Sequence, residues 1–184
     1  MHRFLTGVAA LACLSTAACT SKNPASGTDG GITDAAAEAC VEYESDADLT
    51  TPTVSFGSDI VPIMNFSCGI AGATCHGTPE VTAQQRPFLG LFDGGTDAGE
   101  IISGIVGVKS NEDPTMNVVT ASDPANSFLM HKVDWDECTL TAQCAATKTQ
   151  YTNCGQGMPY SSDQLDQPTR DKIRRWIAQG AKNN

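Results

Sequence analysis

The stretch from Cys68 to Gly77 reads CGIAGATCHG, and it decides how the rest of the chain is interpreted. Cys75 and His76 are adjacent, and Cys68 precedes Cys75 with six residues between them. Thiolates and imidazoles bind metals, and two neighbouring thiols in an oxidising compartment form a disulfide. Three interpretations of the stretch are therefore possible. It could hold a cofactor that contains a metal, form a small disulfide loop with His76 beside it, or bind a zinc ion directly.

The segments on either side of this stretch carry short helical patterns. Before it, Ser58 is a suitable N-cap for a helix. After it, we expect a helix over 100–106, a helix that begins at Pro124, and a terminal helix from near Pro168 to a stop at Gly180. The apolar residues on the inward faces of these helices are Ile60, Ile63, Met64, Phe128, Leu129, Val133, Ile173, Trp176 and Ile177. The sequence thus predicts an all-α fold with short helices and long loops.

Several motifs of the chain also stand in a recognisable order. They are Phe56-x-x-Asp59-Ile60-x-Pro62-Ile63, Cys75-His76-Gly77, Asp123-Pro124-x-x-Ser127-x-Leu129-x-x-Lys132, Cys154-Gly155-x-x-Met158-Pro159 and Ile173-x-x-Trp176-Ile177-x-x-Gly180-Ala181. In this order the motifs resemble the cytochrome c-like domains of exported bacterial lipoproteins and large envelope proteins. The resemblance spans residues 54–182.

This resemblance implies a small cytochrome c-like helical domain over 53–184 that binds haem c. It gives His76 the role of proximal iron ligand and Met158 the role of distal ligand, because haem iron takes two axial ligands. Cys75 takes the position of the second thioether cysteine, and Pro159 would fix the backbone after Met158. The implied function is electron transfer by an exported protein that is not an enzyme, with a redox partner that the sequence does not name.

The spacing of the cysteines departs from the family, which uses Cys-x-x-Cys-His where this chain has Cys-x6-Cys-His. In a continuous helix, Cys68 and Cys75 would lie ~10 Å apart along the axis. A bulge that contains glycine could bring Cys68 back towards Cys75, but attachment machinery that reads the short spacing would not recognise Cys68. We therefore expect a single thioether at Cys75, with Cys68 contributing more to stability than to haem binding. The alternative is a haem-free envelope lipoprotein, held together by disulfides, with a binding or structural role.

The cysteine count is high, at 8 in 184 residues, and exported domains of this size commonly use cysteines for disulfides. Cys40, Cys138, Cys144 and Cys154 are the candidates, and their pairing is open at this stage. Six cysteines follow Cys19, and four of them remain if haem takes two. Both numbers are even, so the cysteine count does not distinguish the haem hypothesis from the disulfide hypothesis. Zinc is the least favoured of the three interpretations, because exported cysteines usually oxidise.

The first residues are typical of an export signal. Arg3 precedes a short apolar run over 4–14, and small residues lead to Cys19. We expect a signal peptide over 1–18, lipidation of Cys19, and a largely disordered tether over 19–52 that is poor in large apolar side chains. The protein would then lie in the cell envelope, in the periplasm or at the cell surface, bound to a membrane through its lipid anchor.

Composition and the remaining motifs exclude several functions. The net charge of −10 argues against a nucleic-acid partner, and no set of residues typical of hydrolysis or phosphate binding occurs. Arg170, Lys172, Arg174 and Arg175 are expected to form a solvated face of the last helix. His131 is expected to be a polar helix position, with axial ligation of iron as the lesser alternative.

Overall fold

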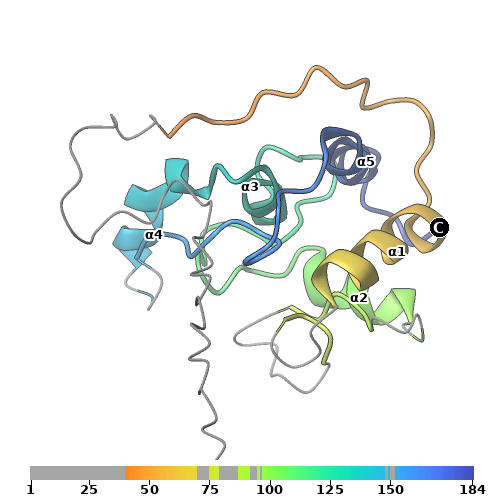
Figure 1. The fold of residues 1–184 in the computed structure, drawn as a ribbon, viewed down its shortest axis with the longest axis horizontal. Helices are drawn as coiled ribbons and strands as arrows, with labels where there is room; N and C mark the ends of the chain where they lie inside the picture. Colours follow the sequence, from red (N-terminus) through yellow and green to blue (C-terminus); the bar gives the residue numbers. More distant parts are fainter. Residues whose placement is uncertain are drawn as a thin grey trace, which may run out of the picture.

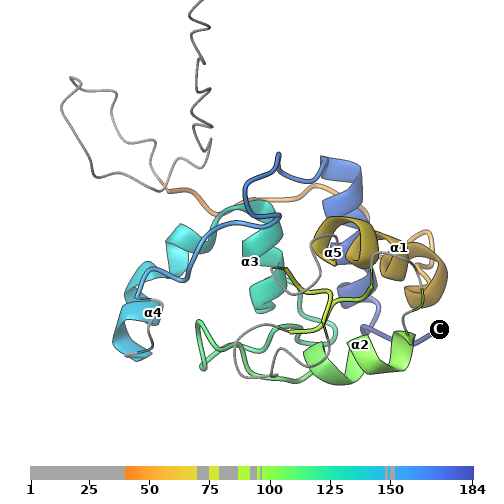
Figure 2. The same cartoon turned by 60° about the horizontal axis from the view of Figure 1, so that its bottom comes forward.

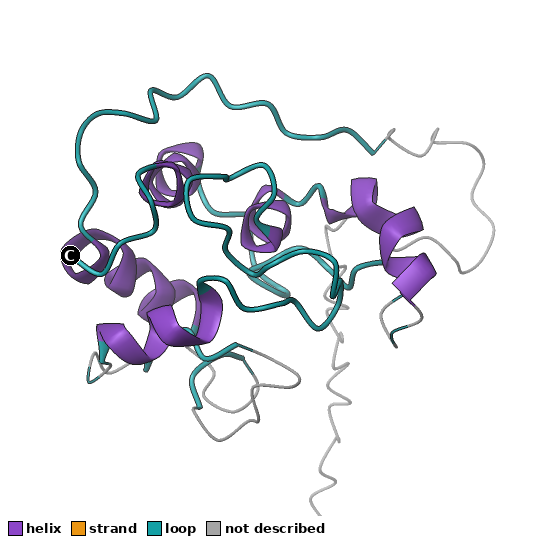
Figure 3. Ribbon diagram, turned by 180° about the vertical axis from the view of Figure 1, so that it is seen from behind, coloured by secondary structure: helices purple, strands orange, loops and turns teal. Residues whose placement is uncertain are grey.

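The computed structural model describes residues 40–69, 75–78, 87–91, 95, 97–147, 149 and 152–184. Its helical elements are η1 (Phe56–Ile60), α1 (Val61–Ile63), η2 (Met64–Cys68), α2 (Ala98–Ile105), α3 (Phe128–Asp134), η4 (Glu137–Leu140), α4 (Thr141–Thr147) and α5 (Gln167–Ala178). Within the described residues β-pairing is limited to isolated bridges, such as Val106 with Val119 (Figure 3). The prediction of an all-α fold with long loops is therefore confirmed. The expected signal peptide, Cys19 and the first part of the tether lie outside the described residues.

The first helical segment runs without a break through η1, α1 and η2. It begins at Ser55, whose Oγ accepts from the Ser58 amide, while the Asp59 carboxylate accepts from the Ser55 amide at 2.9 Å. This reciprocal cap stabilises the first turn, and it places the N-cap at Ser55 instead of the predicted Ser58. Phe56, Ile60 and Met64 follow at helical spacing, and all are fully buried.

The last helix, α5, crosses the first segment and completes the core (Figure 2). The ring of Trp176 lies 4.8 Å from the ring of Phe56, as measured between centroids. Asp166 caps the helix through the Thr169 amide, and Gly180 follows its end at φ +102°. This positive φ favours glycine, which confirms the predicted stop. The apolar residues buried in the same cluster include Ile101, Ile105, Val119, Leu129, Val133, Ile173 and Ile177.

The middle helices begin at other residues than expected. α2 starts at Ala98, because the Asp97 side chain caps the Gly99 amide, and not at Glu100. α3 starts at Phe128 instead of Pro124, because the segment from Asp123 to Ser127 forms a tight turn held by its own side chains. Every residue of α3 is buried, because α5, η4 and the neighbouring loops pack around it (Figure 1).

The expected basic face on α5 is wrong for two of its four residues. Arg170 and Arg174 are both 7% exposed, and both pair with the carboxylate of Asp134 on α3. Arg174 also binds Asp171 at 2.6 Å. Carboxylates compensate the buried guanidinium groups, so these arginines join α3 to α5 instead of facing solvent.

Residues 40–52, which we call the strap, also differ from the sequence-based expectation. We placed them in a disordered tether, but the strap lies along the helical body (orange in Figure 1). The Tyr43 amide donates to the Asp136 carboxylate at 2.7 Å, and Cζ of Arg170 lies 4.3 Å from the centroid of the Tyr43 ring. Gln179, the C-cap residue of α5, donates through its side-chain amide to three strap carbonyls, those of Leu49, Thr50 and Pro52. The strap is therefore attached to the helical body at several points, which the composition of residues 40–52 did not predict.

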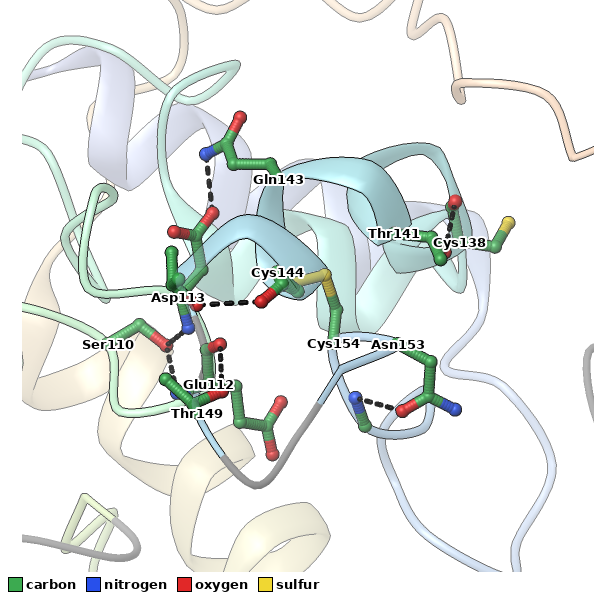
Figure 4. Close-up of a disulfide and its surroundings, with 12 residues drawn as sticks. Ser110, Glu112, Asp113, Cys138, Thr141, Gln143, Cys144, Thr149, Asn153 and Cys154 are labelled. Carbon is green, nitrogen blue, oxygen red and sulfur yellow. Dashed lines mark hydrogen bonds between the residues drawn. A yellow bond between two sulfur atoms is a disulfide. The ribbon is translucent and has the colours of Figure 1, made fainter.

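Two disulfides join segments of the chain outside the main core. The four cysteines expected to form disulfides do so, which confirms that expectation. Cys40 pairs with Cys138 and ties the strap to η4, whereas Cys144 pairs with Cys154 and ties α4 to the following loop (Figure 4). Cys68 and Cys75 are free thiols. No helix among the described residues has the length and apolar composition needed to cross a lipid bilayer.

Candidate functional site

A cavity of about 730 Å³ lies between the end of the first helical segment, α3 and the loop before α5. Cys68, Cys75, His76 and Met158 all line it, so the structure gathers in one place the four residues that the sequence assigned to a single site. Its volume is typical of sites that enclose a small molecule or cofactor, which range over roughly 300–1,000 Å³. The apolar residues of its wall include Phe66, Phe88, Leu89, Val118, Phe128, Leu129, Val133 and Leu165.

The two cysteines lie close to each other despite their long spacing. Cys68 ends η2, and its carbonyl accepts a hydrogen bond of 3.0 Å from the His76 amide. The His76 amide and the Cys68 carbonyl are therefore adjacent, which places Cys75 beside Cys68. Burial raises the pKa of Cys68 to about 12, and the neighbouring Cys75 adds to the shift. The Cys68 thiol is therefore protonated at neutral pH.

His76 is held in one ring orientation by the segment that follows it. Its Nδ1 lies 2.7 Å from the Pro87 carbonyl, and its own carbonyl accepts from the Leu89 amide at 2.9 Å. A carbonyl can only accept, so this hydrogen bond requires the proton on Nδ1 and leaves the ring lone pair on Nε2. Histidines that bind metals commonly donate their second ring N–H to a backbone carbonyl in this way.

Met158 reaches the cavity from the loop between Cys154 and α5. Its amide donates to the Lys132 carbonyl at 2.7 Å, and its carbonyl accepts from Trp135 Nε1 at 2.9 Å. Both backbone polar groups of Met158 are therefore bound to the C-terminal end of α3. A methionine thioether offers a soft, neutral sulfur ligand to a metal.

Two charged residues of the cavity wall were not assigned a role from the sequence. Lys132 is 6% exposed, and its ammonium lies 2.6 Å from Glu112 and 2.9 Å from the Cys154 carbonyl. The signal for Lys132 was present, since it stands among apolar residues on a buried helix. Glu112 lies in the loop between α2 and α3, where the sequence carries no such signal.

His131 does not join the cavity. Its Nδ1 binds Asp136 at 2.8 Å, and its Nε2 lies 3.2 Å from the Ala125 carbonyl. Burial lowers the pKa of His131, but Asp136 and the Ala125 carbonyl together outweigh burial and raise that pKa above its usual value. Both ring nitrogens serve as donors, so His131 has a structural role in place of the iron ligation that we weighed as an alternative.

The zinc interpretation receives no support in the described parts of the chain. Three or more His, Cys, Asp or Glu side chains are nowhere grouped there in a way that could hold a metal ion. Comparison with known proteins adds no further constraint, because no family model, no curated protein and no solved structure matches this sequence. The site is thus defined by its own residues, which are an oriented imidazole, a thioether and two thiols around an apolar cavity.

Proposed function

We propose that this protein is an exported electron carrier, and that its cytochrome c-like domain holds a c-type haem in the cavity beside His76. The observation that carries the proposal is the orientation of His76. Its Nδ1 is bound to the Pro87 carbonyl, and the same cavity is lined by Met158, Cys68 and Cys75. These are the residue types that a c-type haem requires.

The residues that line the cavity fit a haem group. The volume and apolar wall of the cavity suit a large flat macrocycle, and the tautomer of His76 makes Nε2 the candidate proximal ligand. The Sδ of Met158 is the candidate distal ligand, and the thiols of Cys75 and Cys68 are the candidate thioether donors. Bound haem would supply reversible one-electron chemistry, and a His–Met ligand pair raises its potential. The apolar wall would limit access of water and thereby raise the potential further.

The position of Cys68 bears on the number of thioethers that we propose. The expectation of a single thioether rests on the long spacing between the cysteines, both as a distance and as a departure from the short motif that attachment machinery reads. The hydrogen bond from the His76 amide to the Cys68 carbonyl places Cys68 beside Cys75, so the long spacing in the sequence does not keep the Cys68 thiol away from the cavity. We therefore propose that Cys68 as well as Cys75 attaches the haem.

The location of the protein is part of the proposal. Two disulfides among the described cysteines are typical of an oxidising compartment outside the cytoplasm. The N-terminal sequence supports export and lipidation at Cys19, which would hold the domain at a membrane of the cell envelope. Its redox partner would be another protein of that compartment.

Absorption spectra of protein produced together with haem-attachment machinery test the proposal. The parent should show the spectrum of a low-spin c-type haem, and His76→Ala should lose it, because the proximal bond is gone. Met158→Ala should keep covalent haem, lower its potential in a redox titration and bind added imidazole at the open position. Met116→Ala is the matched control, since Met116 is partly buried but lies outside the cavity wall.

Two results would contradict the proposal. One is a matured parent protein without haem in which Cys68 and Cys75 are joined to each other. That result favours the haem-free, disulfide-held envelope protein. The other is a parent spectrum that neither His76→Ala nor Met158→Ala changes, since the haem would then be bound elsewhere.

A further inference from the structure

The loop that carries Met158 is bound at both of its ends by one lysine of α3. Lys132 Nζ donates to the Cys154 carbonyl at 2.9 Å, and the Lys132 carbonyl accepts from the Met158 amide at 2.7 Å. The side chain and the main chain of a single residue therefore close a ring with the segment 154–158. The Cys144–Cys154 disulfide fixes the first residue of that segment independently.

Trp135 supplies a further attachment of the same loop. Its Nε1 donates to the Met158 carbonyl at 2.9 Å, and a Cβ added at Gly157 would lie only 2.4 Å from Cδ1 of the Trp135 ring. The indole thus packs directly on the Gly157 backbone, which requires glycine at that position. Trp135 itself ends α3 in the left-handed region, at φ 60°, and this turns its ring toward the loop.

The burial of Lys132 calls for an explanation. A buried ammonium costs free energy unless it is paired, and well-packed apolar residues often stabilise a protein as well as a buried ion pair does. Here Glu112 provides the pairing charge at 2.6 Å, and the Glu112 carboxylate lies beside Gly155 of the same loop. The contacts of Lys132, Trp135 and Glu112 all reach the segment 154–158 that carries Met158. Together they hold this loop in one geometry.

We infer that Lys132 is a positioning residue, which holds the side chain of Met158 at the cavity with the help of Trp135. The inference rests on the proposed function, in which Met158 is the distal ligand. A distal thioether is a weak ligand, so its occupancy of the iron depends on how closely the backbone holds it in place. Loosening the loop should therefore weaken the Met158 bond without touching either ligand.

Three variants of the full-length protein test this inference. Lys132→Met keeps the alkyl chain and the main-chain carbonyl but removes the ammonium, and Trp135→Phe keeps a ring but removes the donor to Met158. Lys172→Met on α5 is the matched control, because its side chain is 43% exposed and its nearest ion-pair partner is Asp59 at 4.0 Å. Hydrogen exchange of the Met158 amide should be several-fold faster in the first two variants and unchanged in the control.

A second measurement links the loop to ligation. In haem-loaded protein, added imidazole competes with Met158, so its affinity should rise several-fold in Lys132→Met and Trp135→Phe and stay constant in Lys172→Met. The amides of Ile173 and Ile177, in the core of α5, report global stability and should exchange at the parent rate. If the amides of Ile173 and Ile177 exchange faster in Lys132→Met than in the parent, that variant is globally unstable. The Trp135→Phe variant then decides whether the inference holds.

The outcomes are distinguishable. Unchanged exchange at Met158 overturns the inference, and so does faster exchange with unchanged imidazole affinity, because Lys132 would then hold the loop but not the ligand. If the parent carries no haem, the proposed function fails, and the exchange rates alone decide whether Lys132 and Trp135 hold the Met158 loop.

Discussion

Glu137 is an acidic side chain that the fold buries almost completely. It is 2% exposed, and its Oε2 has no hydrogen-bond partner among the described residues. Burial raises its pKa above the ordinary value of 4.5, and the nearby Lys132 only partly offsets this effect. The folded protein therefore binds a proton at Glu137 more readily than the unfolded chain does. Its contribution to stability is fully present below the ordinary pKa and is lost as the pH rises through the raised pKa.

Glu137→Gln should reduce this pH dependence. The amide has nearly the same shape as the carboxyl group but no charge. At neutral pH the free energy of unfolding of the variant should therefore be roughly 1 kcal/mol higher than that of the parent, and at acidic pH the two should be nearly equal. Urea unfolding followed at several pH values measures the difference. Glu44→Gln in the exposed part of the strap is the control. Parallel pH profiles for Glu137→Gln and the parent would contradict this account of Glu137.

The residues of the site divide into those that the sequence could identify and those that it could not. Cys75, His76 and Met158 were predicted because their chemistry depends on the side chain and on short motifs. The Pro87 carbonyl that orients His76 was not, because every residue has a carbonyl and its position depends on the path of the loop. The Glu112–Lys132 pair was missed for a related reason, since its members lie 20 residues apart in the sequence.

At the scale of elements, side-chain caps decide where the helices begin. α5 was predicted well, because its cap, its proline and its terminal glycine are all local signals. α3 was predicted too early, because the turn before it uses the same Asp-Pro pair that often starts a helix. The strap carries few large apolar residues and is bound mainly through its carbonyls, Tyr43 and Cys40. Composition alone therefore did not distinguish it from a tether.

The two disulfides should contribute unequally to stability. The Cys40–Cys138 pair closes a sequence separation of 98 residues, and the Cys144–Cys154 pair closes one of 10. Chain entropy predicts a loss of about 4–5 kcal/mol for removal of the first pair and about 2–3 kcal/mol for removal of the second. Denaturant unfolding of the two double Cys→Ala variants measures both losses. A larger loss for the Cys144–Cys154 variant would show that local packing outweighs loop length.

For the whole molecule, the described residues from Cys40 onward form a helical body that contains the cavity, and the strap is bound to α5 and to the loop that carries Asp136. The segment before Cys40 lies outside the described residues, and its proposed role is to join the domain to a lipid at Cys19. The full chain carries a net charge of −10, and such a charge disfavours contact with the phosphates of a nucleic acid.

Replacing Cys19 with Ser tests this arrangement. The lipid is attached through the cysteine sulfur, so the variant should move from the membrane fraction to the soluble fraction of the cell envelope. Cys13→Ser in the same N-terminal segment is a matched control that should leave the distribution unchanged. Identical fractionation of the parent and Cys19→Ser would show that lipidation at Cys19 does not hold the protein at the membrane.

The most direct measurement of the central claim is the mass of the denatured protein after maturation with haem-attachment machinery, together with the mass of the peptide that contains Cys68 and Cys75. Denaturation removes any haem that only the fold holds, so a retained haem is covalently bound. Attachment through both thiols predicts one haem per chain, carried on that peptide, with neither Cys68 nor Cys75 available to a thiol reagent. A chain without added haem mass, in which Cys68 and Cys75 are joined by a disulfide, would contradict it.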